Sequence, residues 1–108
     1  MEINIRTRKP TLGNITGGLS GPCVKPVALR MVWQVAQAIQ VPIIGMGGIT
    51  SWEDAVEFFL AGASAIAVGT ANFMDPAVTM KICDGLNDYL AQNHIDHIQD
   101  LVGKIELG

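Results

Sequence analysis

Apolar residues recur every three to four positions along three stretches of the chain, which is the spacing of one face of an α-helix. The first stretch begins at Pro26, which suits a first helical turn, and the second ends at Gly62. The third follows Asp75, which we expect to cap it, with Pro76 in its first turn. The positions that we expect to be buried are Ala28, Val32, Val35 and Ile39, then Ala55, Val56, Phe59 and Leu60, then Val78, Ile82, Leu86 and Leu90.

Two short apolar runs between these helices predict strands. Residues 41–46 and 65–68 are apolar without alternating polar positions. Such runs are typical of parallel strands that are covered on both faces. Thr50 and Glu53 fit a capping box at the start of the helix that follows the first run. The alternation of strand and helix predicts the right-handed parallel crossovers of an α/β fold.

The two ends of the chain predict smaller elements. Ile3 and Ile5 alternate with polar residues, and apolar character resumes over 12–15, which predicts a short antiparallel hairpin. A last short helix is expected to carry Ile98, Leu101, Val102 and Ile105. Because two parallel strands would leave sheet edges unpaired, we expect the chain to associate with itself or with further strands.

Composition narrows the class of protein. The chain has 108 residues, of which 49% are hydrophobic, and a net charge of −3 without a basic stripe, so we expect no nucleic-acid partner. No apolar run approaches the roughly 20 residues that cross a bilayer, and the first residues lack a signal-peptide layout. We therefore expect a cytoplasmic protein without a membrane partner. Cys23 and Cys83 lack metal or redox spacing and are expected to be thiols that serve in packing.

Glycines follow both predicted strands. The segments 45–49 and 69–73 each end an apolar run and precede a helix-like stretch. Glycine exposes backbone N–H groups to a ligand, and the ends of the last two strands of a (β/α)₈ barrel commonly bind phosphate. Gly47 and Gly48 are also explained by a tight turn alone. The Thr70 hydroxyl fits either a ligand donor or the cap of a short helix near Asn72, and the two roles can coexist.

A third glycine-rich loop spans 16–22. Gly21 would let the backbone approach a planar ring or a phosphate, whereas Ser20 fits a ligand donor and a flexible connector equally well. We expect Lys25 to be solvated, and His94 and His97 to be surface residues rather than metal ligands. No nucleophile, general base or carboxylate pair accompanies the glycine loops, so the sequence indicates binding without catalysis.

Several ordered motifs resemble a known family. They lie at 14–22, 25–30, 42–49, 61–65 and 68–73. Together they closely resemble the C-terminal third of class 1 dihydroorotate dehydrogenases, the flavin enzymes of pyrimidine synthesis, and the Leu-Ser-Gly-Pro loop is similar to that of the NAD-linked B subtype. The resemblance implies that residues 1–108 are a single segment, the C-terminal β/α units of an FMN-binding TIM barrel. The barrel would be incomplete in this chain and preceded by the short hairpin.

The resemblance also implies residue roles. Gly21 would lie against FMN, Gly47 and Gly48 would bind its phosphate from the seventh strand, and Gly69 and Thr70 would do so from the eighth. The family's cysteine base, its lysine near the flavin and its orotate-binding asparagines would precede residue 1. We therefore expect no catalytic residue and no metal ligand in this chain, which would be inactive in isolation.

The resemblance implies partners as well. In the full-length family these are dihydroorotate or orotate and an iron–sulfur flavoprotein electron-transfer subunit, and we also expect a homo-oligomer. Three alternatives stay open: a non-catalytic segment that binds FMN or another phosphorylated ligand, a remnant that only self-associates, and a part of another flavin oxidoreductase barrel.

Overall fold

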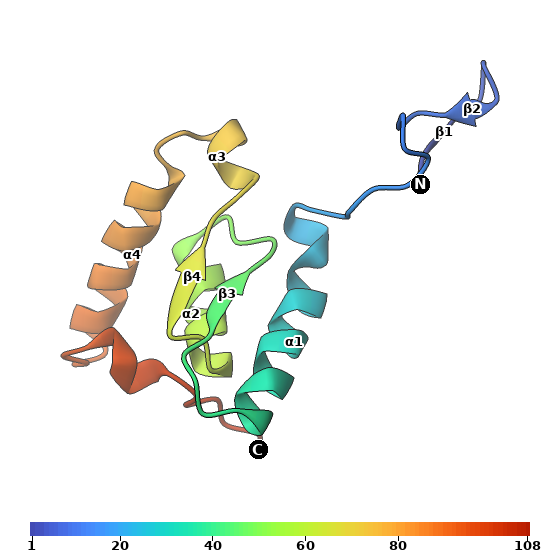
Figure 1. Ribbon diagram of the computed structural model, residues 1–108. Helices are drawn as coiled ribbons and strands as arrows, with labels where there is room; N and C mark the ends of the chain where they lie inside the picture. Colours follow the sequence, from blue (N-terminus) through green and yellow to red (C-terminus); the bar gives the residue numbers. More distant parts are fainter.

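The computed structural model describes all residues, 1–108, and shows a small parallel sheet with helices behind it and at its sides (Figure 1). No helix is both long and apolar enough to cross a membrane. In chain order the elements are β1 (Ile3–Asn4), β2 (Lys9–Pro10), the 3-10 helix η1 (Pro22–Val24), α1 (Lys25–Ala38), β3 (Ile44–Met46), α2 (Trp52–Ala61), β4 (Ala65–Ala67), α3 (Ala71–Met74), α4 (Val78–Gln92) and the 3-10 helix η2 (Ile98–Leu101).

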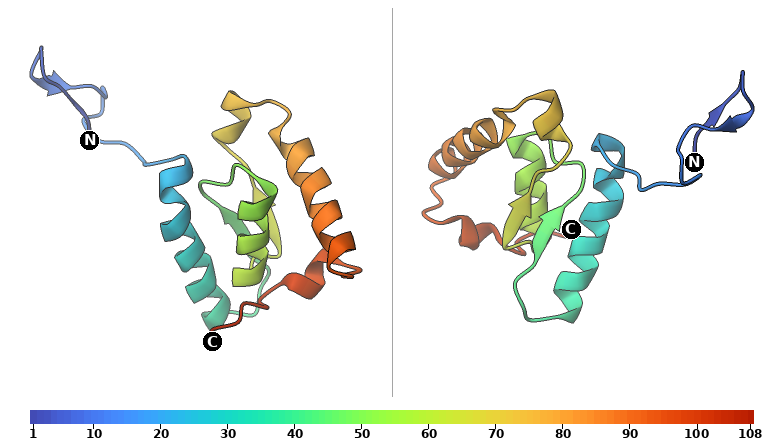
Figure 2. Two further views of the ribbon diagram at one scale, coloured as in Figure 1. Left: turned by 180° about the vertical axis from the view of Figure 1, so that it is seen from behind. Right: turned by 45° about the horizontal axis from the view of Figure 1, so that its top comes forward.

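Strands β3 and β4 are parallel neighbours, as the sequence predicts. Ile44 pairs with Ala65 and Met46 pairs with Ala67, so the carboxyl ends of both strands lie at the same edge of the sheet. Helix α2 connects them and lies between α1 and α4, which the view from behind shows clearly (Figure 2). The two glycine segments, which follow these strands, are therefore brought side by side.

The core is centred on α2. Phe58 is fully buried beneath β3, where a Cβ on Gly45 would lie 2.6 Å from its ring. The predicted stripes of α2 and α4 are confirmed, with Val78 and Ile82 buried on the latter. After η2 the chain returns to α2, where the N–H of Gly103 donates to the carbonyl of Phe59 at 3.0 Å. The last predicted helix is thus a 3-10 turn that ends before Ile105.

One face of the sheet is open, so the prediction of strands buried on both faces is wrong for this chain. Ile44 is 60% exposed and Met46 is 59% exposed. Val35 and Ile39 of α1, which the sequence places in a buried stripe, are exposed as well. The physical reason is that the helices of the chain cover only the face of the sheet that Phe58 contacts.

The N-terminal hairpin is confirmed, but its second strand is Lys9–Pro10 rather than 12–15. Asn4 explains the earlier reversal, because its Oδ1 accepts hydrogen bonds from the backbone N–H groups of Arg6 (3.0 Å) and Thr7 (3.1 Å). Residues 1–20 are all exposed, and the hairpin projects away from the helices (Figures 1 and 2).

The start of α2 differs from the predicted capping box by one residue. Ser51 is the N-cap, and its Oγ accepts a hydrogen bond from the N–H of Asp54 at 3.3 Å. The acidic residue of the box is Asp54 instead of Glu53. Its Oδ2 accepts a hydrogen bond from the N–H of Thr50, the residue before the cap, at 2.9 Å. The predicted Asp75 cap of α4 is wrong, because Ala77 is the N-cap and Pro76 lies in the turn before the helix. Asp75 orders that turn instead, since its Oδ1 accepts from the N–H of Ala77 at 3.0 Å.

Candidate functional site: a glycine-lined hollow

The carboxyl ends of β3 and β4 form one wall of a hollow of about 260 Å³. Residues 19–21 of the loop before α1, with Val24, complete the lining. All five residues that the sequence indicates as ligand contacts line it, namely Gly21, Gly47, Gly48, Gly69 and Thr70. Three loops that lie far apart in the sequence therefore converge on a single concave site.

The hollow offers hydrogen-bond donors without charge. The backbone N–H groups of Gly47, Gly48, Gly69 and Thr70 donate to no group of the chain. No charged side chain belongs to the lining. Consecutive free N–H groups in turns that include left-handed residues form concavities that bind anions. The site is therefore suited to an anionic group held by backbone dipoles.

Gly48 has a structural requirement of its own. Its φ is +74°, and a Cβ there would lie 2.8 Å from the carbonyl oxygen of Gly21 and 2.8 Å from the backbone nitrogen of Lys25. Gly47 has a φ of +119°, and its Cβ would lie 2.8 Å from that of Ala28. The tight-turn interpretation thus holds for both glycines, and both also belong to the lining of the hollow.

Gly69 differs from this pair. Its φ is not in the left-handed region, and a Cβ there would meet no atom within 4 Å. No contact within the chain therefore explains a glycine at this position. Gly69 belongs to the lining of the hollow, among the residues at the end of β4.

Thr70 keeps its hydroxyl free. It stands at the N-cap position of α3, but its side chain makes no capping hydrogen bond. Asn72 orders the loop instead, because its Nδ2 donates to the carbonyl of Val68 at 2.8 Å and to that of Gly69 at 3.1 Å. The cap role for the Thr70 side chain is therefore not seen, and its hydroxyl remains available to a ligand.

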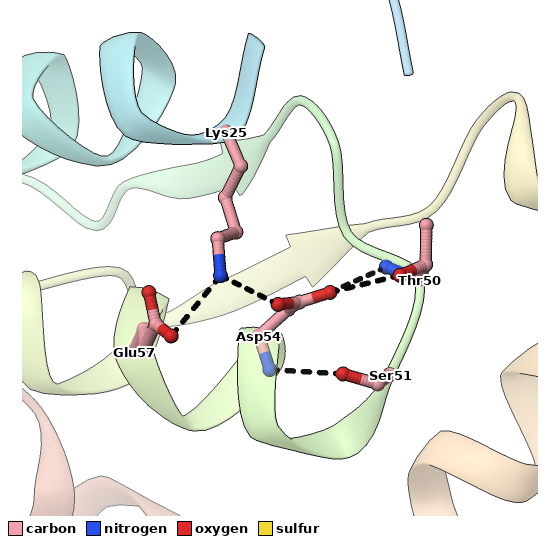
Figure 3. A network of polar contacts seen from close by, with 5 residues as sticks. All are labelled: Lys25, Thr50, Ser51, Asp54 and Glu57. Atoms are coloured by element: carbon pink, nitrogen blue, oxygen red, sulfur yellow. Dashed lines mark hydrogen bonds and ion pairs between the residues drawn. The ribbon is translucent and has the colours of Figure 1, made fainter. Parts of the chain in front are cut away.

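Lys25 is not solvated, contrary to the sequence-based expectation. Its Nζ lies 2.7 Å from Oδ1 of Asp54 and 3.1 Å from Oε1 of Glu57 (Figure 3), and its side chain is 24% exposed. The hydrogen bonds to Asp54 and then Glu57 raise the pKa of Lys25 against the effect of burial. Burial by itself would raise the pKa of Asp54, but hydrogen bonds from Lys25 and Thr50 outweigh it and lower that pKa.

The two cysteines correct another expectation. Cys23 and Cys83 are free thiols, but both are exposed, so neither serves in packing. Cys83 lies on the outer side of α4, next to the buried Ile82. His94 and His97 are exposed, as predicted.

The family is settled by a match over most of the chain. The family model described as dihydroorotate dehydrogenase matches residues 1–90. The chain belongs to the dihydroorotate dehydrogenase family.

Curated relatives within this family agree. The chain is 59% identical over 107 residues to the dihydroorotate dehydrogenase B (NAD(+)) catalytic subunit of Parabacteroides distasonis, which covers 99% of the chain and 35% of the relative. It is 60% identical over 105 residues to the protein of the same name from Alkaliphilus oremlandii, covering 97% of the chain and 35% of the relative. The chain therefore spans about a third of the length of the relatives that it matches.

Solved structures also match. The dihydroorotate dehydrogenase of Eimeria tenella in complex with ferulenol has a TM-score of 0.77 at 37% identity, over 82% of this chain and 24% of that one. The ligand-free form has a TM-score of 0.76 at 37% identity, over 82% of this chain and 26% of that one. The matched part of the chain thus has the fold of part of a dihydroorotate dehydrogenase.

Two features of this dihydroorotate dehydrogenase segment were missed by sequence reasoning. The ties from Asn72 to the loop after β4 and from Lys25 to Asp54 both hold loops that line the hollow or adjoin it. The spacing Ser51-x-x-Asp54 is a capping-box pattern and signals only the contact between Ser51 and Asp54. The pairing with Lys25 is 29 residues distant in sequence and carried no local signal.

Proposed function

We propose that residues 1–108 are one segment, the FMN-phosphate-binding C-terminal part of a dihydroorotate dehydrogenase B catalytic subunit. In this proposal β3 and β4 are the seventh and eighth strands of a (β/α)₈ barrel. The observation that carries it is the convergence of Gly21, Gly47, Gly48, Gly69 and Thr70 on one hollow with free backbone donors. The ends of these two barrel strands are where such folds commonly bind phosphate.

The residues fit the phosphate end of FMN. Phosphate oxygens accept hydrogen bonds, and the hollow presents four free N–H groups and the hydroxyls of Ser20 and Thr70. The open space beside Gly69 leaves room for a ligand atom where a side chain would otherwise stand. In this proposal Gly21, which also lines the hollow, would lie against the remainder of the cofactor.

In the proposed enzyme, FMN would supply the hydride acceptor for the oxidation of dihydroorotate to orotate. The part of this chain is to bind and orient the cofactor, since no titratable side chain lines the hollow to hold or move a proton. We propose that the base is supplied from outside residues 1–108. We propose that the isolated chain binds FMN but does not catalyse the oxidation of dihydroorotate.

The open face of the sheet fits this assignment. Ile44 and Met46 would be covered by the other strands and the interior of the barrel.

We also propose, from the B-type relatives, an iron–sulfur flavoprotein electron-transfer subunit as partner and a homo-oligomeric assembly. The two free thiols fit a reducing compartment, the cytoplasm.

Flavin titration of the 108-residue chain with matched variants tests the proposal. Gly69→Asp places a carboxylate in the phosphate site without a steric clash, and Gly13→Asp makes the same change in open space beside the hairpin. We expect quenching of FMN fluorescence by the unaltered chain and by Gly13→Asp, and its loss in Gly69→Asp. Riboflavin, which lacks the phosphate, should bind weakly to all three. Equal binding of FMN by all three proteins would contradict the proposal.

A further inference from the structure

The backbone of Lys25 lies against Gly48 at the hollow, and its side chain belongs to an ion-pair network. Its backbone nitrogen adjoins Gly48, where a Cβ would lie 2.8 Å away. Its side chain extends to α2, where Asp54 and Glu57 lie one turn apart (Figure 3). A single residue thus connects the start of α1, the turn after β3 and the first turns of α2.

The network continues through Asp54 into the turn itself. While Oδ1 of Asp54 binds Lys25, its Oδ2 accepts the N–H of Thr50 at 2.9 Å and the Thr50 hydroxyl at 3.0 Å. Thr50 follows Gly48 by two residues. The turn that contains Gly47 and Gly48 is therefore held at both ends, by contact with Gly21 and Lys25 and by the hydrogen bonds of Asp54.

The network is suited to fixing geometry. The Asp54 side chain is 14% exposed, and Lys25 is tied to partners 29 and 32 residues away in sequence. By contrast, the pair of Lys81 and Asp75 at 2.6 Å is largely exposed and joins residues six apart. Partly buried pairs lose less to solvent screening and side-chain freedom than exposed ones do, and their directional bonds hold the joined segments in one arrangement.

We propose that Lys25 is a positioning residue for the phosphate hollow. Through Asp54 it holds the Gly47–Thr50 turn in contact with the backbone of Gly21. The N–H groups of the turn thereby keep the spacing that a phosphate needs. Glu57, the more exposed partner, is not in the path to Thr50 and supports the ammonium group only. The role in cofactor binding rests on the proposed function, whereas the closure of the turn does not.

Amide hydrogen exchange of the 108-residue chain tests the closure without any ligand. Within the turn only the Thr50 amide has a hydrogen-bond acceptor, Oδ2 of Asp54, so its exchange reports the closure. Lys25→Met and Asp54→Asn should speed exchange of the Thr50 amide about tenfold and leave the amides of α4 unchanged. Glu57→Gln, Lys25→Arg and the matched ion-pair control Lys81→Met should change exchange at Thr50 less than twofold. Unchanged exchange at Thr50 in Asp54→Asn, or an equal effect of Glu57→Gln, overturns the proposal, even where Lys25→Met exchanges faster throughout.

Flavin binding by the same variants tests the consequence. Lys25→Met should weaken FMN binding about tenfold while riboflavin binding changes less than twofold, and Lys25→Arg should restore FMN binding. A merely structural role would weaken both flavins by the same factor, and that result overturns the positioning role. If the unaltered chain fails to prefer FMN over riboflavin, the proposed function fails, and the exchange experiment still decides whether Lys25 closes the turn.

Discussion

The backbone of Gly48 packs directly on the backbone nitrogen of Lys25, and no side chain fits between them. A Cβ on Gly48 would lie 2.8 Å from that nitrogen and 2.8 Å from the carbonyl oxygen of Gly21. Both neighbours are backbone atoms, one just before η1 and one at the start of α1, so they cannot move aside as a flexible side chain would. The turn after β3 and the loop before α1 are therefore fitted to each other, and together they shape the hollow.

This contact predicts a large effect of Gly48→Ala. The variant must open the turn and also place alanine at a φ of +74°, so we expect a loss of about 2 to 4 kcal/mol in the free energy of unfolding. Gly69→Ala is the matched variant, because its Cβ meets nothing within 4 Å, and it should change stability by less than about 0.5 kcal/mol. Urea denaturation measures both, and similar stabilities for the two variants would contradict the packing described.

Gly85 of α4 gives a second test of close packing. A Cβ there would meet Trp52 of α2, lying 2.6 Å from its Cβ. Alanine in a helix interior is worth about 1 kcal/mol over glycine, but overpacking against a fixed Cβ costs about 1 to 3 kcal/mol. We expect Gly85→Ala to be less stable in urea denaturation and to separate Trp52 from Tyr89, whose rings lie 5.7 Å apart. A more stable Gly85→Ala protein would mean that α2 and α4 pack less closely than described.

The Lys25–Asp54 pair predicts a pH dependence of stability. The folded-state pKa of Asp54 lies below its ordinary value of 3.8, so its ionised form stabilises the fold above that value. That contribution is lost as the pH falls through the folded-state pKa. We expect Asp54→Asn to be about 1 to 2 kcal/mol less stable between about pH 5 and pH 8, with the difference shrinking below pH 3.8.

Asp75→Asn serves as the control for that measurement. The hydrogen bond from Lys81, followed by that from the N–H of Ala77, lowers the pKa of Asp75 as well, but its pair is exposed and screened by solvent. The loss of stability should be smaller for Asp75→Asn at each pH. A difference for Asp54→Asn that grows on acidification would contradict the assigned direction of its pKa shift.

The sequence predicted those parts of the fold that depend on local pattern. The helical stripe through Val78 and Ile82 and the parallel pair β3–β4 follow from periodicity and run length, and both are confirmed. The convergence of the glycine segments followed from the strand order alone. The burial of Ile44 could not be predicted correctly, because periodicity shows that a face is apolar and not whether this chain covers it.

Other sequence-based predictions were wrong where a side chain pairs with a residue far away in the sequence, or where two neighbouring residues suit the same position. Lys25 at a helix start would be unfavourable without a partner, and only the tertiary fold brings Asp54 to it. The capping box was displaced by one residue because Thr50 and Ser51 both suit a cap, and the choice depends on which one adopts extended backbone. The roles of Gly21, Gly47, Gly48, Gly69 and Thr70 toward FMN stay a prediction.

Phosphorus NMR of FMN tests the central claim most directly, because it observes the phosphate group itself. With the unaltered 108-residue chain, the phosphorus resonance should shift and broaden as the phosphate enters the hollow beside Gly47 and Gly69. With Gly69→Asp it should stay at its free position, whereas Gly13→Asp should behave like the unaltered chain. A flavin that is quenched by the unaltered chain while its phosphorus resonance does not change would place the phosphate in solvent and contradict the account.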